Sequence, residues 1–296
     1  MITLKEYPNV KFLNYKDENE VKKFVFGDGV NPAEPLYKYS TWKNAKQSMA
    51  DRYLWMSNPS VWEDPFEKYF LNAQYEDSAG NLMSFPFKNK VFCNCLTPDH
   101  NSEAHWITYA KKNVGVSLRI NVQELIERLD CFGIAHSDYR IYIGKVSYRK
   151  QSEIQVKSIH KIPLLDSEVK RDIEDADFCA NLMLLKRKAF KHDNEVRLIL
   201  IQDNTNEESK GVEFSYNYDS TGSVIKDYPN ENLISRVFTS PFYGVEKRDS
   251  IQKELEKKKY GFSRYPVNLN SGKTTYFKSR IQRSRLYDSV KSKILL

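Results

Sequence analysis

Residues 195–201 run Glu195-Val196-Arg197-Leu198-Ile199-Leu200-Ile201, a short apolar stretch that opens with two charges. The stretch lies between Asp193-Asn194 and Asp203-Asn204, which favour turns, so it predicts a buried strand. Side chains two apart on a strand share a face, and we expect the Glu195 carboxylate beside the Arg197 guanidinium. A core strand admits charges that are paired or functional. The pair is therefore either an ion pair that ties the strand end to its neighbour or a single-carboxylate catalytic site.

The rest of the chain predicts an α+β fold. Its 296 residues, with 13% aromatic content, suit a sheet-containing globular protein. Strands are predicted near residues 36–39, 52–57, 91–96, 116–120, 141–148 and 195–201, and helices near 42–49, 104–111, 122–129, 166–190, 245–259 and 277–294. Because strands dominate the centre and do not alternate regularly with helices, a doubly wound sheet is not expected. The simplest partition is one domain over residues 1–245 and a basic extension over 246–296 packed on it.

Charge is distributed unevenly along the chain. Residues 247–296 hold 14 Lys and Arg against 4 Asp and Glu, a net charge of +10, whereas the other 246 residues hold 32 against 35, a net charge of −3. A basic segment of this kind suits a polyanion, so we expect RNA or DNA as a partner of the C-terminal segment. No apolar run reaches the ~20 residues that cross a bilayer, and the first residues lack a signal-peptide pattern, so no membrane and a cytoplasmic location are expected.

Several kinds of chemistry are disfavoured by missing motifs. The sequence has no glycine-rich phosphate loop, no GxSxG elbow and no HExxH pair. The four cysteines form one close pair, Cys93 and Cys95, and the five histidines form no helical pair, so no metal site is expected. A carboxylate cluster stays open, because Asp64 and Glu67 in the Trp62–Glu67 turn could converge with Glu195. Asp64 before Pro65 is equally explained as a helix N-cap or turn.

Ordered sequence blocks resemble a known bacterial family. The blocks are Leu36-Tyr37-Lys38-Tyr39, Leu54-Trp55-Met56-Ser57, Trp62-Glu63-Asp64-Pro65-Phe66-Glu67, Val91–Leu96, Trp106-Ile107-Thr108-Tyr109-Ala110 with Gly115-Val116, and Lys186 with Asn194-Glu195-Val196-Arg197-Leu198. In this order, over about residues 36–200, they resemble domain of unknown function 2971. Two positions depart from the family pattern: Glu63 stands for the usual Asn, and Asn194 interrupts the acidic doublet before Glu195.

The resemblance implies a function. Some members of this family occur in anti-phage and toxin–antitoxin loci, and the order of blocks is similar to that of ADP-ribosyltransferases, which implies a central, mostly antiparallel split sheet with flanking helices. By this analogy Glu195 is the catalytic residue, and NAD is the substrate. The residues implied to bind NAD are Tyr37, Lys38, Ser57, Trp106, Tyr109 and Arg197. A cognate antitoxin or a defence-system protein is an expected partner.

Two other functions remain open from the sequence. A non-enzymatic module would use the charged blocks structurally and recruit nucleic acid or protein through the basic C-terminal segment. A metal-dependent nuclease would use Asp64, Glu67 and Glu195 with Mg²⁺. The aromatic pair Trp106 and Tyr109, three residues apart on a predicted helix, either stacks on a ring ligand or packs in the core.

Overall fold

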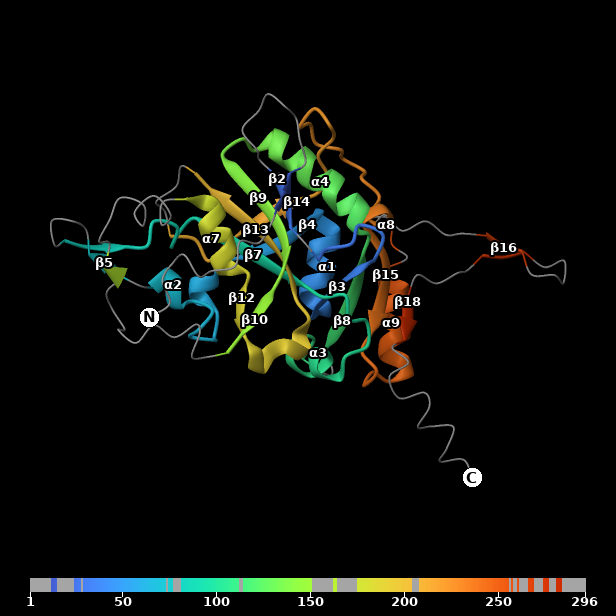
Figure 1. The fold of residues 1–296 in the computed structure, drawn as a ribbon. Helices are drawn as coiled ribbons and strands as arrows, with labels where there is room; N and C mark the ends of the chain where they lie inside the picture. The colour runs from blue at the N-terminus through green and yellow to red at the C-terminus, as the bar shows by residue number, and fades with distance from the viewer. Residues whose placement is uncertain are drawn as a thin grey trace.

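The computed structural model describes residues 12–14, 24–27, 29–72, 74–76, 81–111, 114–150, 162–163, 175–203, 208–255, 257, 260, 266–268, 274–276 and 281–283. Within these ranges the fold is α+β, as predicted, and two sheets dominate it (Figure 1). Most neighbouring strands in both sheets are antiparallel. The exceptions in these two sheets are the parallel pairs β2–β9 and β15–β18.

The larger sheet contains the mostly apolar residues 196–201. Its seven strands follow the order β1 (Phe12–Asn14), β2 (Phe24–Gly27), β9 (Tyr139–Lys145), β13 (Val196–Gln202), β7 (Val91–Leu96), β4 (Tyr53–Ser57) and β14 (Gly211–Ser215). β13 lies between β9 and β7, so the predicted buried strand is confirmed, and Val196 to Ile201 are all at most 2% exposed.

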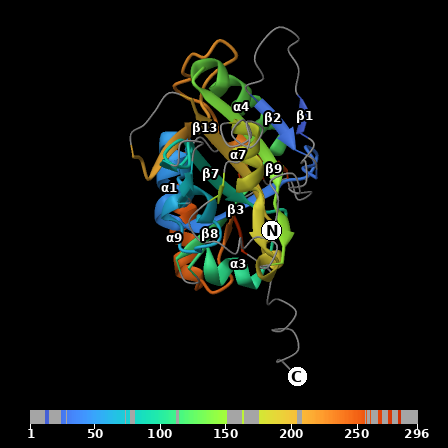
Figure 2. The same cartoon turned by 60° about the vertical axis from the view of Figure 1, so that its left-hand side comes forward.

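Alternate residues of β13 face two different cores. Leu198 and Leu200 join a cluster with Leu125 of α4 (Val122–Ala135), while Ile199 and Ile201 join one with Cys179 of α7 (Ala176–Met183). Since successive side chains of a strand point to opposite faces, α4 and α7 cover opposite faces of the sheet. Figure 2 shows the two helices with β13 and β9.

The second of the two main sheets has four strands, in the order β18 (Ile281–Arg283), β15 (Ile234–Thr239), β8 (Gly115–Ile120) and β3 (Leu36–Thr41). Helix α1 (Trp42–Asp51) follows β3 directly and leads into β4 of the other sheet, so it connects the two sheets covalently. Thr41 caps α1 by accepting a hydrogen bond from the Asn44 backbone. Helices α3 (Glu103–Thr108), α8 (Asn230–Leu233) and α9 (Val245–Leu255) flank these strands.

Two predicted helices are wrong in part. Residues 185–190 lie in the predicted helix 166–190, but they form β12 (Leu185–Arg187) and the start of the 3₁₀ helix η3 (Lys188–Asp193). β12 pairs in parallel with β10 (Ser147–Arg149), so tertiary pairing overrides local helical propensity there. Residues 281–283 lie in the predicted helix 277–294 but form β18, which extends the four-stranded sheet; the rest of that prediction lies outside the described residues.

The remaining elements are short. Strands β5 (Gln74–Glu76), β6 (Leu82–Ser84) and β11 (Ile162–Pro163) form a three-stranded sheet, and β16 (Pro266–Asn268) pairs with β17 (Thr274–Tyr276). Helix α2 (Tyr69–Asn72) and the 3₁₀ helix η2 (Pro59–Val61) follow β4. None of the helices in the described ranges is both long enough and apolar enough to cross a bilayer.

Candidate functional site

Strand β7 is the place where the two sheets separate. β4 pairs with β7 at Ser57 and Cys93, and β3 meets the chain just after β7, where Tyr37 and Thr97 exchange backbone hydrogen bonds of 2.7 and 3.0 Å. Cys93 and Thr97 have the same parity along the strand, so both contacts use one edge of it. Between them the strands β3 and β4 diverge and leave a fork.

Two side chains bridge the fork in place of backbone ladder bonds. The Lys38 ammonium donates to the Cys95 carbonyl oxygen at 3.1 Å, and Asn94 Nδ2 donates to the Trp55 carbonyl oxygen at 2.8 Å. Lys38 thus links β3 to β7, and Asn94 links β7 to β4. Burial lowers the pKa of Lys38, against the raising effects of Cys95 and Glu195.

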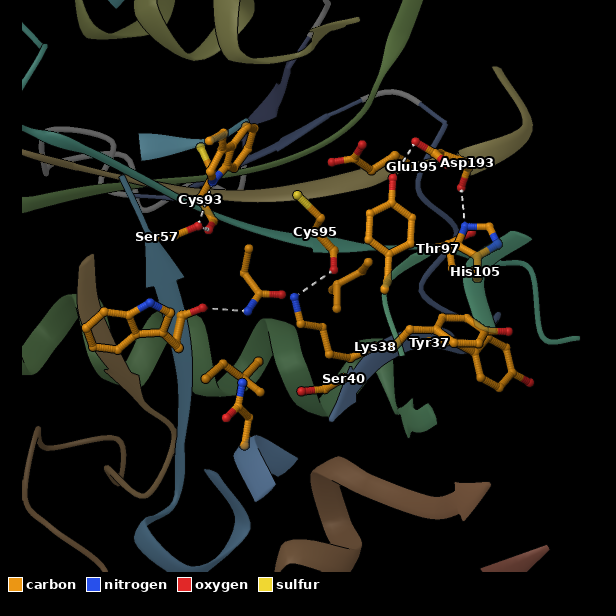
Figure 3. A pocket seen from close by; sticks show the side chains of 18 of the residues that line it. Tyr37, Lys38, Ser40, Ser57, Cys93, Cys95, Thr97, His105, Asp193 and Glu195 are labelled. Atoms are coloured by element: carbon orange, nitrogen blue, oxygen red, sulfur yellow. Dashed lines mark hydrogen bonds between the residues drawn. The ribbon is translucent and has the colours of Figure 1, made fainter. Parts of the chain in front are cut away.

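A cavity of about 1080 Å³ occupies the fork (Figure 3). Its volume lies just above the range of about 300–1,000 Å³ that is typical of small-molecule sites. Seven of the residues singled out in the sequence line it together: Tyr37, Lys38, Ser57, Asp64, Glu67, Tyr109 and Glu195. Segments that are far apart in the chain therefore meet at one site. Figure 3 shows Lys38 from β3, Ser57 from β4, Cys95 from β7 and Glu195 around it.

Glu195 is a buried carboxylate held by two cations. Its side chain is only 4% exposed, and it accepts hydrogen bonds from Arg197 Nε at 2.6 Å and from Lys186 Nζ at 2.9 Å. Burial alone would raise the pKa of Glu195, but the charge and hydrogen bond of Arg197, with the charge of Lys186, lower it to about 2. Glu195 is therefore ionised at neutral pH. It also accepts from Arg197 Nη2 at 3.2 Å and from the Cys95 thiol, so a ligand hydroxyl would take the place of the weak hydrogen bond from the thiol.

The second cation, Lys186, joins Glu195 to the rim of the cavity. Its ammonium also donates to Asp193 Oδ2 at 2.8 Å, and the Tyr109 hydroxyl donates to the same oxygen at 2.7 Å. Burial would lower the pKa of Lys186, but Glu195 and Glu67 raise it, so the amine stays protonated. Tyr109 is 39% exposed and marks the open end of this chain of hydrogen bonds.

Arg197 lies behind the cavity wall and is engaged on all sides. Besides Glu195, its guanidinium binds the Met183 carbonyl oxygen at 2.6 Å and the Glu67 carboxylate. It also lies over the Trp62 ring, 4.8 Å from the ring centroid. Arg197 is 1% exposed and is not among the residues that line the cavity. This position favours a role for Arg197 in holding Glu195 in place over a role in binding phosphate.

The predicted aromatic pair is divided between the core and the cavity. Tyr109 lines the cavity, whereas Trp106 is 1% exposed and packs edge-on against Tyr39, 4.9 Å between ring centroids. The two rings are three residues apart, but α3 ends at Thr108 and Tyr109 already follows it. The structure does not bring Trp106 to the cavity surface.

Asp64 forms the predicted turn and also makes an ion pair. Asp64 Oδ1 accepts from the Phe66 backbone at 2.9 Å, as an Asp before Pro is expected to do, and Oδ2 pairs with Arg187 at 3.0 Å. Glu67 pairs with Arg197 and lies 3.6 Å from Lys186. Each of the three carboxylates Asp64, Glu67 and Glu195 thus has a basic partner already, which leaves little of their charge for a metal ion. Within the described ranges no three His, Cys, Asp or Glu side chains are grouped to bind one.

Four residues of the site were not picked out from the sequence as site residues. Asp193 and Lys186 complete the ion-pair network, Cys95 contacts Glu195, and the His105 ring lies 3.1 Å from the Asp193 carbonyl oxygen. Burial, with Glu195 nearby, raises the pKa of Cys95 to about 12, so its thiol stays protonated. The sequence did point to Lys186, since it belongs to the last block of the family resemblance. For Asp193 the sequence indicated only a turn.

Comparison with protein families gives a match over part of the chain. Residues 105–198 match the family model described as "Protein of unknown function (DUF2971)". The match confirms the resemblance to this family over the part of the chain that holds Tyr109, Lys186, Asp193, Glu195 and Arg197. No curated protein and no solved structure matches the chain.

Proposed function

Residues 105–198 match the family model DUF2971, whose function is unknown, and for the site that they help to build we propose an NAD-dependent ADP-ribosyltransferase activity. The observation that carries the proposal is the convergence of Tyr37, Lys38, Ser57 and Glu195 on one cavity. These residues come from two different strands, β3 and β4, and from the residue that directly precedes a third, β13. Their order along the chain is the order that the ADP-ribosyltransferase analogy requires.

The fork between two antiparallel sheets also supports the proposal. The resemblance implies a split sheet, and here β3 and β4 diverge along one edge of β7. The cavity offers the Lys38 ammonium, which within the described residues donates to one carbonyl oxygen, that of Cys95. A phosphate oxygen would use its remaining N–H groups.

The proposed chemistry needs one well-held carboxylate. The bond between ribose C1′ and the nicotinamide nitrogen breaks, its electron pair neutralises the positive pyridinium, and C1′ becomes oxocarbenium-like. Glu195, charged at neutral pH, accepts a hydrogen bond from a ribose hydroxyl and stabilises that positive charge. The acceptor then forms the new bond to C1′ and loses its proton.

Arg197 and Lys186 act on this reaction through Glu195. They fix both carboxylate oxygens, so that the anion is preorganised before NAD arrives. Neither needs to touch the substrate for this. The protein is proposed to act in the cytoplasm as a bacterial toxin or anti-phage effector, a role that rests on the family resemblance.

Release of nicotinamide from NAD tests the proposal. We expect the wild-type chain to release nicotinamide, and Glu195→Gln to lose about 100-fold or more of that rate. Glu195→Asp keeps the charge for Arg197 and Lys186 but withdraws it from the cavity, so it should fold and still lose activity. Circular dichroism and thermal unfolding check both variants. Absence of release by the wild type, or full release by a folded Glu195→Gln variant, contradicts the proposal.

A further inference from the structure

The cavity has an inner end on the core side of the fork. Phe92 and Leu96, two residues on either side of Asn94, belong to the main core cluster together with Leu54 and Leu118. Because side chains alternate along a strand, Asn94 points to this side, whereas Cys93 and Cys95 point to the side of Glu195. Asn94, Leu54, Leu96 and Leu118 all line the cavity.

Asn94 has an unmet hydrogen-bond acceptor at this inner end. The side chain is 2% exposed, and its Nδ2 is held by the Trp55 carbonyl oxygen at 2.8 Å. Within the described part of the chain, Asn94 Oδ1 has no hydrogen-bond partner. A buried carbonyl oxygen without a hydrogen-bond donor destabilises a protein. A donor on a bound ligand would therefore explain why Asn94 is present in the core.

Besides the acceptor Oδ1, the amide of Asn94 offers a hydrogen-bond donor. The Trp55 oxygen takes one of the two Nδ2 hydrogens, which leaves Oδ1 and a second N–H in one plane. An acceptor beside a donor is complementary to an amino group beside a ring nitrogen, which is the edge that adenine presents. Aliphatic walls at Leu54, Leu96 and Leu118 suit the faces of such a ring.

We propose that the inner end of the cavity is a subsite for an adenine-type ring, with Asn94 Oδ1 accepting from the exocyclic amino group. Lys38 lies between this subsite and Glu195, because its ammonium bonds Cys95 at the fork. A ligand that joins an adenine ring to a ribose through phosphates would place the phosphates at Lys38 and the reacting ribose at Glu195. The inference rests on the proposed function, since NAD has these parts.

Calorimetric titration of the full chain tests the subsite. The probes are ADP-ribose, which cannot undergo nicotinamide release, and its hypoxanthine counterpart, in which an oxygen replaces the amino group. We expect the wild type to bind ADP-ribose about tenfold or more tightly than the counterpart. Asn94→Leu should bind the two with equal affinity. The control Asn44→Leu, an exposed amide of α1 at the cavity rim, should keep the preference.

The outcomes separate the subsite from the reaction. Equal wild-type affinities, a preference that persists in Asn94→Leu, or no binding of either probe overturns the subsite. If Asn94→Leu does not fold, the shorter Asn94→Ser takes its place. Nicotinamide release without adenine preference would support the proposed function and contradict the subsite. Adenine preference without nicotinamide release leaves the subsite and removes the proposed function.

Discussion

Glu195 keeps its charge inside the protein because two buried cations share it. A carboxylate that is 4% exposed would otherwise be protonated or excluded from the core. Arg197 is itself fixed by Glu67 and the Met183 carbonyl oxygen, and Lys186 by Asp193. The pair predicted from spacing is thus one part of a five-residue network, and its structural and functional interpretations are compatible: the same partners that tie the strand end also hold the carboxylate at the cavity.

Low pH should destabilise the folded protein by protonating Glu195. Its pKa is about 2 in the folded protein, against an ordinary value of 4.5. Because the pKa of Glu195 is lower in the folded than in the unfolded protein, its ionised form stabilises the folded state. This contribution is fully present above the unfolded-state pKa of about 4.5 and is lost as the pH falls toward 2. The shift corresponds to a contribution on the order of 3 kcal/mol to the free energy of unfolding. Urea unfolding between pH 7 and 2 should show this loss, and Glu195→Gln should flatten it, while the exposed Glu246→Gln should not.

Removing Lys186 should destabilise the protein strongly. Lys186→Met leaves Glu195 and Asp193 without one of their cations, and breaking a buried ion pair costs about 3–5 kcal/mol. Lys188→Met provides the control, because Lys188 is exposed two residues further along and should change the free energy of unfolding by less than about 0.5 kcal/mol. Urea unfolding at pH 7 measures both. Similar values for the two variants would show that the network does not stabilise the fold.

At the level of helices and strands, the local sequence pattern predicted the central strands of the two large sheets well, but it was a poor guide to the edge strand β18 and to the smaller sheets. The apolar runs of β7 and β13 predicted their strands, because residues buried on both faces leave a continuous apolar signal. The helix prediction for residues 185–190 was wrong, because β12 forms by pairing with β10, a strand distant in the sequence. The site followed the same division: Glu195 and Lys38 stood out by charge in strands, whereas Asp193 and Asn94 matter through contacts that spacing does not show.

Gly115 connects α3 to β8 and permits a close approach. A Cβ at this position would lie 2.6 Å from the Ala110 Cα and closer still to its carbonyl oxygen, so Ala110 and the end of α3 would have to move. Gly115→Ala should therefore lower the free energy of unfolding by about 1–3 kcal/mol or more. Gly244→Ala is the matched control, since a Cβ there meets nothing within 4 Å. Equal stability of the two variants in urea would contradict the close packing.

Across the whole molecule, the two sheets separate at β7 and the cavity fills the gap. The covalent link through α1 and the bridges from Lys38 and Asn94 hold the fork open at a fixed width. A ligand there contacts both sheets at once, so its binding energy adds to the stability of the whole domain. The family resemblance implied a split sheet, but the place where it divides was not readable from the sequence, because it depends on which strands share the edge of β7.

NAD should therefore raise the unfolding temperature of the wild-type chain. A ligand at 100 times its Kd adds about 2.7 kcal/mol of stability. Ser40→Trp places a large ring on a residue that lines the cavity and should abolish the effect. Ser250→Trp, at an exposed position of α9 away from the cavity, should keep it. Differential scanning calorimetry measures the shift, and an equal shift in both variants would place NAD elsewhere.

The most direct measurement is mass spectrometry of protein and nucleic acid incubated with NAD and the purified chain. The site predicts that the wild type adds an ADP-ribosyl group to one of these acceptors, and that Glu195→Gln, shown to be folded, adds none. A wild-type reaction that releases nicotinamide but modifies no acceptor would limit the activity to hydrolysis. No change in NAD or in any acceptor, or equal modification by the Glu195→Gln variant, would contradict the assignment of Glu195 as the catalytic carboxylate.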